Sequence, residues 1–161
     1  TDDIIAKNDY EWSKATESPL AQAAVRGAEK ITVRPLLGHS GKAVKLPKGA
    51  SLSYDFYCDK SGDARFTIAA IPCFLNAVKD MRLSVSIDRG EPVICQLKEV
   101  YNSKDWKFDL WRGQTLKSFY VTLPGGSHNV TIKALDDNVM IDQWVLDYDA
   151  DREYYVFPVA K

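Results

Sequence analysis

The fold class is decided by the stretch Arg82-Leu83-Ser84-Val85-Ser86-Ile87-Asp88, in which apolar and polar residues alternate. Successive side chains of a β-strand point to opposite faces, so the apolar residues share one face and the serines share the other. The stretch Asn129-Val130-Thr131-Ile132-Lys133-Ala134 repeats this alternation. Strands with one dry and one wet face are typical of an antiparallel sheet that packs against a second sheet.

Short alternating or apolar runs recur outward from these two stretches, and Gly, Pro, Asn and Asp residues separate them. Runs of this length between turn-forming residues predict β-strands. The predicted strands are Ile4–Ala6, Ile31–Arg34, Ala43–Leu46, Ser51–Cys58, Ala64–Ala70, Arg82–Ile87, Val93–Leu97, Trp106–Leu110, Lys117–Leu123, Ser127–Ala134, Val139–Asp147 and Tyr154–Phe157. Many short strands favour a sandwich over a fold in which strands alternate with helices.

One segment, Pro19–Arg26, is predicted to be a short helix. Ser18 can cap its start, the proline suits its first turn, and Gly27 suits its end. The predicted fold is therefore all-β: a jelly-roll-like antiparallel β-sandwich with one short helix near the N-terminus. The sequence has no evident linker or internal repeat, so residues 1–161 are predicted to form a single β-sandwich domain.

The composition argues against several classes of partner. The chain has 161 residues, 45% of them hydrophobic, and its 21 basic and 22 acidic residues give a net charge of -1. Nucleic-acid-binding domains usually carry a basic excess or patch, so no nucleic-acid partner is expected. No apolar run approaches the length of about 18 residues that a membrane-spanning helix needs, so no membrane partner is expected either.

The cysteines Cys58, Cys73 and Cys95 are odd in number and far apart in the sequence. This spacing fits neither a disulfide framework nor a metal-binding cysteine pair. Each cysteine lies in an apolar, strand-like run. All three are therefore predicted to be small buried hydrophobic residues.

A series of short phrases in a fixed order points to a known family. The phrases are Arg26-Gly27-Ala28, Pro35-Leu36-Leu37-Gly38-His39-Ser40-Gly41-Lys42-Ala43-Val44, Leu52-Ser53-Tyr54-Asp55-Phe56, Ser61-Gly62-Asp63-Ala64, Ile71-Pro72, Leu83–Pro92, Trp106, Pro124–Val130 and Val139–Asp147. Over about residues 3–158, this order resembles the C-terminal β-sandwich domain of glycoside hydrolase family 115. More distantly, it resembles galactose-binding-like sandwich modules that bind carbohydrate.

Two stretches depart from that family's pattern. Glu29-Lys30-Ile31-Thr32 stands where the family usually has a tryptophan, and Glu153–Pro158 replaces its usual Ser-Tyr and Gly-Pro-Pro ending. In the family this tail contacts other parts of the parent enzyme, so the partner of the tail can differ in this protein.

The resemblance implies a non-catalytic accessory module of a glycan-degrading enzyme. Such a module would dock on the catalytic domain of its parent, bind carbohydrate, or do both. By the same resemblance the parent would act on plant-type polysaccharide as an α-glucuronidase-like hydrolase, and would be periplasmic or extracellular. The alternative is a purely structural interdomain or oligomer-interface module that binds no sugar. The sequence does not indicate which sugar would be bound or which oligomeric state the protein has.

Aromatic residues next to polar ones supply the candidate ligand surface, because sugars stack their apolar faces on flat rings and present hydroxyls to polar groups. The richest aromatic cluster runs from Tyr101 to Arg112. In the predicted strand Trp106–Leu110, Trp106 alternates with Phe108 and Leu110, and these three are predicted to face the core. Trp111 falls on the opposite face and is predicted to be exposed.

The predicted ligand-binding residues follow from that reading. They are Trp111, Arg112, Tyr101 and Asn102, with Trp12, which lies next to Tyr10 and Glu11, as a second location. Trp144 alternates with Asp142 and Leu146 in an apolar strand and is predicted to pack within the sheet instead.

No catalytic residue is predicted, and the chain itself is not expected to be an enzyme. Gly38-His39-Ser40-Gly41 brings together a histidine and a serine, but adjacent residues cannot easily present both side chains to one substrate atom, and the Gly-x-Ser-x-Gly motif is absent. This segment is predicted to be a structural turn. His128 is predicted to make a hydrogen bond at the start of a strand.

No metal site or cofactor is predicted. Related sugar-binding sandwiches hold a structural Ca²⁺ between acidic residues of the first strand and an aspartate of the last. Asp142 could supply the latter, but Ile5 and Lys7 occupy the positions where the former are expected. Ca²⁺ needs several oxygen ligands, which these two residues do not supply.

Overall fold

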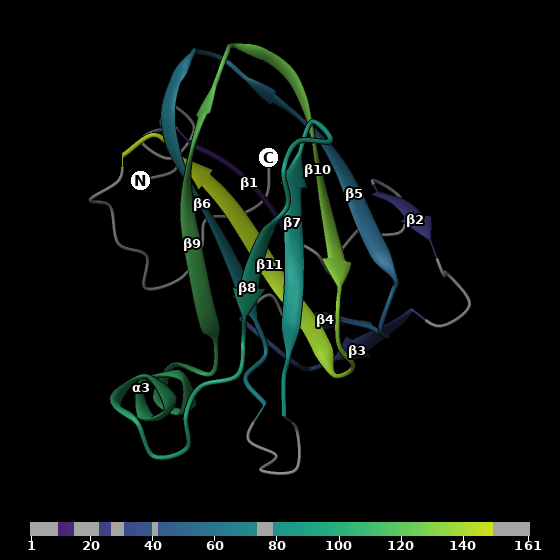
Figure 1. Ribbon diagram of the computed structural model, residues 1–161, viewed down its shortest axis with the longest axis vertical. Helices are drawn as coiled ribbons and strands as arrows, with labels where there is room; N and C mark the ends of the chain where they lie inside the picture. The colour runs from purple at the N-terminus through teal and green to yellow at the C-terminus, as the bar shows by residue number, and fades with distance from the viewer. Residues whose placement is uncertain (1–9, 15–22, 27–30, 40–41, 74–78, 150–161) are drawn as a thin grey trace.

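The computed structural model describes residues 10–14, 23–26, 31–39, 42–73 and 79–149, and two sheets face each other in it (Figure 1). The β11 sheet has the strand order β3-β4-β11-β6-β9, with β1 also beside β11, and the β10 sheet has the order β2-β5-β10-β7-β8. All pairings between these strands are antiparallel. The predicted antiparallel β-sandwich is therefore confirmed.

The β11 sheet is built from strands of both halves of the sequence. Its members are β1 (Tyr10–Lys14), β3 (Thr32–Pro35), β4 (Lys42–Leu46), β6 (Gly62–Ala70), β9 (Thr115–Leu123) and β11 (Val139–Asp147). The β10 sheet contains β2 (Ala23–Arg26), β5 (Ser51–Cys58), β7 (Arg82–Ile87), β8 (Val93–Gln96) and β10 (Gly126–Ala134). The helix α3 (Lys104–Arg112) precedes β9.

Most predicted strands between residues 31 and 147 are present. Those at 51–58, 82–87 and 139–147 have the predicted bounds, and the others agree within two residues. The predicted strands Ile4–Ala6 and Tyr154–Phe157 lie outside the described residues. Within the described residues, no helix is long and apolar enough to cross a membrane.

The predicted helix at Pro19–Arg26 is wrong where the structure describes it. Ala23–Arg26 is the edge strand β2, and its four residues pair with residues 51–54 of β5. Alanine is a strong helix former, but helix propensity is worth less than about 1 kcal/mol per residue, and pairing with a neighbouring strand overrides it. The remaining residues of the predicted helix, 19–22, lie outside the described part.

The predicted strand at Trp106–Leu110 is wrong as well, because this segment lies in α3. Ser103 caps the helix start by accepting a hydrogen bond from the Trp106 backbone N–H at 3.1 Å. Gly113 ends the helix in a left-handed conformation with φ 73°. Serine before and glycine after the segment are helix-end signals, and they outweigh an alternation of only three apolar residues.

The core lies between the two sheets, and Trp144 of β11 is at its centre. This side chain is 1% exposed and stacks on Phe66, with ring centroids 5.4 Å apart. Tyr54 and Phe56 meet the indole edge-on from the β10 sheet, at 5.8 and 5.7 Å. The predicted packing of Trp144 in its sheet is thus confirmed, and its ring also lies in the core.

The cysteines follow their prediction in part. Cys58 and Cys95 are buried, whereas Cys73 is half-buried, and all three are free thiols. Burial raises the pKa of the Cys95 thiol, which makes its reactive thiolate form less accessible.

Candidate functional site

The outer face of the β10 sheet carries a polar groove. On β10, His128, Val130 and Ile132 point into the sandwich and are buried, so the residues between them point outward. The groove is an open cavity of about 770 Å³ over β5, β10 and the end of β7. Its lining residues are Gly49, Ser51, Ser53, Asp55, Asp88, Arg89, Asn129, Thr131 and Lys133.

Hydrogen bonds between neighbouring strands hold the floor of this groove in place. The Asn129 side-chain amide donates to the Asp55 carboxylate at 2.8 Å, directly across the β10–β5 pairing. The hydroxyls of Ser53 and Thr131 lie 2.5 Å apart. These groups are therefore ordered before any ligand arrives, which reduces the entropy lost on binding.

An aromatic residue marks one end of the groove. Tyr57 lies two residues beyond Asp55 on β5, so it points to the same face, and it is 59% exposed. A second cavity of about 610 Å³ joins Tyr57 to Asp55, Asp88 and Asn129, which also line the groove. An exposed ring beside fixed polar groups suits a ligand that has an apolar face and several hydroxyls.

The turn between β7 and β8 forms one wall of the groove. Asp88 and Arg89 both have positive φ, 52° and 59°, and the Gly90 N–H donates to the Ile87 carbonyl at 2.9 Å. This is a type I′ hairpin turn, in which two positive-φ positions usually hold Asn and Gly. Backbone strain of about 1–3 kcal/mol at such a residue persists only where the surroundings hold it in place.

The Asp88 carboxylate is what holds this turn. One of its oxygens accepts from the Asn129 backbone N–H at 2.8 Å, and the other lies 2.6 Å from Nδ1 of His128. Burial raises the pKa of Asp88, but the hydrogen bonds from His128 and Asn129 outweigh this effect and leave that pKa below its ordinary value.

His128 bridges two turns. Its Nε2 lies 2.6 Å from the Pro124 carbonyl oxygen, and its side chain is 5% exposed. Burial lowers the pKa of His128, but the hydrogen bonds to Asp88 and Pro124 outweigh this effect and leave the pKa above its ordinary value. The hydrogen bond predicted for this histidine is confirmed.

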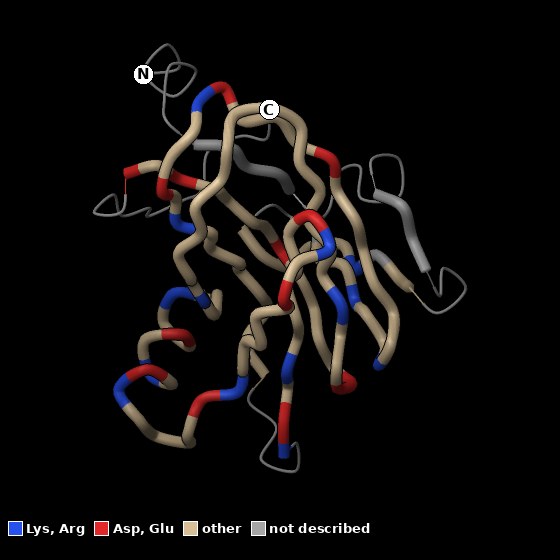
Figure 2. The backbone as a smooth tube through the Cα atoms, turned by 45° about the horizontal axis from the view of Figure 1, so that its top comes forward, with Lys and Arg blue, Asp and Glu red and all other residues tan. Residues whose placement is uncertain are grey.

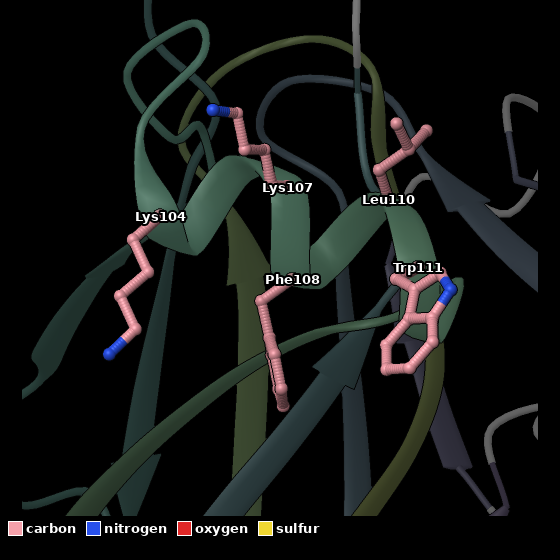
Figure 3. Close-up of a pocket in the computed structure, with 5 residues that line it drawn as sticks. All are labelled: Lys104, Lys107, Phe108, Leu110 and Trp111. Carbon is pink, nitrogen blue, oxygen red and sulfur yellow. The ribbon is translucent and has the colours of Figure 1, made fainter.

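The helix α3 carries a second, apolar surface (Figure 3). A shallow cavity of about 500 Å³ lies against it, lined by Lys104, Lys107, Phe108, Leu110 and Trp111. Trp111 is 88% exposed, as predicted, but Phe108 and Leu110 are also exposed and Trp106 is only half-buried. The predicted core positions of Phe108 and Leu110 are wrong because residues two apart lie on different sides of a helix.

The predicted ligand-binding residues divide between the two ends of α3. Tyr101 packs edge-on against Trp106 near the helix start, with ring centroids 5.0 Å apart, and Asn102 directly precedes the Ser103 cap. Trp111 and Arg112 are at the other end, about 12 Å away along a helix of this length. The Arg112 guanidinium lies 4.4 Å from the Phe108 ring centroid.

Trp12, the other predicted location, lies on β1 opposite Val145 of β11, and its side chain is outside the described part. Whether any of these predicted residues binds a ligand stays a prediction.

Asp142, considered above as a calcium ligand, is part of a buried structural network. It lies at a bulge in β11, between the segment that pairs with β4 and the segment that pairs with β1. Its carboxylate is 0% exposed and accepts from the His39 N–H at 2.8 Å and from the Gln114 side-chain amide at 2.7 Å. His39 in turn contacts the Arg112 carbonyl oxygen through Nε2 at 2.7 Å.

The prediction that residues 38–41 form a structural turn is therefore confirmed for Gly38 and His39, whereas residues 40 and 41 lie outside the described part. Within the described residues, no group of three or more His, Cys, Asp or Glu side chains is arranged to hold a metal ion.

The sequence matches the family model of the glycosyl hydrolase family 115 C-terminal domain over residues 21–160. The chain belongs to this family. A solved GH115 4-O-methyl-α-glucuronidase with specificity for decorated arabinogalactans is similar, with 27% identity and a TM-score of 0.66 over 78% of the chain. The match covers 17% of that enzyme, so this GH115 C-terminal domain corresponds to a small part of it.

Two carbohydrate-binding modules share the fold of this GH115 C-terminal domain. One is the C-terminal family 6 module of a laminarinase from Zobellia galactanivorans, with 16% identity, a TM-score of 0.58, and coverage of 86% of the chain and 98% of the module. The other is a family 35 module from Clostridium thermocellum, with 15% identity, a TM-score of 0.62, and coverage of 85% and 98%. A search of curated proteins found no significant match.

Sequence reasoning missed the groove of this GH115 C-terminal domain, although a signal for it was present. Polar residues alternate with apolar ones both in 51–55 and in 129–133, and these two stretches become neighbours on the outer face. The alternation identified a wet face, but only the pairing of β5 with β10 showed that the two wet faces form one surface. Figure 2 shows acidic and basic residues interspersed along the described chain.

Proposed function

We propose that this domain is a non-catalytic accessory module that binds a glycan chain in the groove of the β10 sheet. The observation that carries the proposal is the ordered polar floor that ends at the exposed ring of Tyr57. Successive outward residues on β10 cover about 13 Å along the strand, which suits a short oligosaccharide better than one monosaccharide. Asp55 and Asn129 supply acceptors and donors for sugar hydroxyls, and Tyr57 supplies a face for stacking.

The contacts and lowered pKa of Asp88 support binding rather than glycoside cleavage. Cleavage needs one carboxyl group that donates a proton and a second one that acts as base or nucleophile. The Asp88 carboxylate has a lowered pKa and uses both oxygens in contacts with His128 and Asn129, so it is a poor proton donor. Asp88 is therefore poorly suited to be the proton-donating member of such a pair.

The proposal extends to the parent protein. A GH115 C-terminal domain serves a glycoside hydrolase, and we propose that the parent is α-glucuronidase-like and acts on plant-type polysaccharide outside the cytoplasm. The support is the 27% identity to part of a 4-O-methyl-α-glucuronidase, a protein that has specificity for decorated arabinogalactans. The catalytic domain of the parent is then the expected covalent neighbour of this module.

Replacing Tyr57 with alanine should weaken glycan binding about tenfold or more, equivalent to about 1.4 kcal/mol, because the stacking face is lost. The isolated domain would be titrated calorimetrically with a panel of neutral and acidic plant oligosaccharides, and the best ligand would be tested on the variant. Tyr120→Ala is the matched control, since Tyr120 is 71% exposed but lies on β9 of the other sheet. Equal affinity of the Tyr57 variant and the wild type would contradict the groove as the site.

A second candidate function is that the domain docks through α3 on the catalytic domain of its parent and binds no sugar. It is favoured by the exposure of Phe108 and Trp111, which point to the same side of this short helix (Figure 3), because exposed apolar patches mark interaction surfaces. In this case, amides of α3 should exchange with deuterium at least about tenfold more slowly in the intact parent than in the isolated domain. Trp111→Ala should abolish that difference, and the glycan panel should be silent. Equal exchange in both forms would exclude docking through α3.

A further inference from the structure

The two ring nitrogens of His128 both face hydrogen-bond acceptors. Nδ1 lies 2.6 Å from the Asp88 carboxylate and Nε2 lies 2.6 Å from the Pro124 carbonyl oxygen. A neutral imidazole has a single N–H, so one of these contacts would then set a lone pair against an oxygen. With its other oxygen, Asp88 accepts from the Asn129 N–H at 2.8 Å, as a carboxylate does. Both contacts can be hydrogen bonds to an ionised Asp88 and the Pro124 carbonyl only in the imidazolium form, in which both nitrogens donate.

This imidazolium connects two turns at the same end of the groove. Asp88 begins the turn between β7 and β8, whose second residue, Arg89, lines the groove. Pro124 lies in the turn between β9 and β10, two residues before Gly126, which pairs with Cys58 directly after Tyr57. His128 thus fixes both the turn that presents Arg89 to the groove and the turn that lies beside Tyr57.

The elements around His128 each place charged, titratable or aromatic side chains near its ring. From the β7–β8 turn, Asp88 contacts the ring and Arg89 lies next to it in the chain. From β5, Asp55 and Tyr57 line the same cavity as His128, whereas the Phe56 ring packs near the imidazole at 5.5 Å between centroids. Asp88 is the acid in direct contact, so its carboxylate is the main stabiliser of the charge on His128.

We infer that protonated His128 is a positioning residue that clips the Asp88–Arg89 turn to the Pro124 turn, and that its protonation regulates the glycan groove. This inference rests on the proposed function of the groove. When His128 loses its proton, it can donate to only one of its two acceptors, and the bridge opens. Glycan affinity should then be highest below the pKa of His128 and decline as the pH rises through it.

The wild-type protein provides the first test, with no substitution that could disturb folding. The His128 ring and the backbone amides of Arg89, Gly90 and Gly125 would be followed by NMR from about pH 5.5 to pH 9, the range around an ordinary histidine pKa. The amides of both turns should shift with the same midpoint as the ring. If the chemical shifts of these amides do not change while the ring titrates, the proposed link between the two turns is wrong.

Two variants separate the two contacts. His128→Asn places an amide near the position of Nδ1 and keeps the donor to Asp88, whereas His128→Gln places it near Nε2 and keeps the donor to Pro124. Neither side chain can be protonated, so both variants should lose the pH dependence of glycan affinity. Both should bind about fivefold to tenfold more weakly than the protonated wild type, as expected for the loss of one hydrogen bond to a charged or buried group.

His39→Gln is the matched control, because it removes the other histidine, which contacts the Arg112 carbonyl. It should keep the pH dependence of binding. A variant of His128 that retains the wild-type pH profile would contradict the inference, because a merely structural histidine would lower stability without flattening that profile. A glycan panel that is silent at every pH would instead overturn the proposed function, and the NMR titration would still decide whether the clip exists.

Discussion

Replacing Trp144 with alanine should lower the free energy of unfolding by about 4 kcal/mol, as is typical of large aromatic residues in a well-packed core. The indole is 1% exposed, stacks on Phe66 of β6, and meets Tyr54 and Phe56 of β5 edge-on. It therefore joins the two sheets at the centre of the sandwich. The truncation would leave a cavity between rings that the two hydrogen-bonded sheets prevent from closing.

Urea unfolding followed by circular dichroism measures this effect. Trp111→Ala is the matched control, since the same atoms are removed from a side chain that is 88% exposed. That variant should stay within about 0.5 kcal/mol of the wild type. Similar losses for the two variants would mean that Trp144 is not the centre of the core.

Replacing Gly38 with alanine should lower the free energy of unfolding by about 3 kcal/mol. The residue has φ 75°, a left-handed conformation that costs other residues about 1–2 kcal/mol. A Cβ atom at this position would also overlap the carboxylate of Asp142. That carboxylate is fixed by His39 and Gln114 and cannot move aside, so a steric cost of about 1–3 kcal/mol is added.

Gly49→Ala separates the two contributions to this loss. Gly49 has a similar φ of 86°, but no atom lies within 4 Å of the Cβ position. Its alanine variant should lose only the backbone share, about 1–2 kcal/mol. Equal losses at the two glycines in urea unfolding would show that the contact with Asp142 carries no energetic cost.

The strands of the sandwich were predictable because the pattern that defines them is local. In 82–87, 51–58 and 139–147, the alternation or the continuous apolar run is itself the consequence of one or two buried faces. The two segments that were mispredicted are those where local signals conflict. Ala23–Arg26 is rich in helix-favouring residues but completes the edge of a sheet, and 104–112 alternates briefly but is enclosed by helix caps.

The predicted ligand surface shows that closeness in the sequence does not predict which side chains lie together in the fold. Tyr101 and Trp111 are close in sequence, but α3 places them at opposite ends of a helix. The residues of the groove are far apart in sequence: Asp55, Asp88 and Asn129 come from three strands or turns. Exposed carboxylates and amides are common on any protein surface. None of these three residues by itself therefore indicated a binding site.

The sequence alone determined that this protein is an antiparallel β-sandwich of the GH115 C-terminal family, with one buried and one exposed face on its strands. This was possible because a strand with one buried face needs an apolar residue at every second position, and that alternation is visible in the sequence. Only the tertiary structure decided which wet faces meet. Strand pairing is a long-range property, so the neighbours β5, β10 and β7 leave no trace in the local pattern of any one of them. The bridge from His128 to Asp88 across 40 positions arises in the same way.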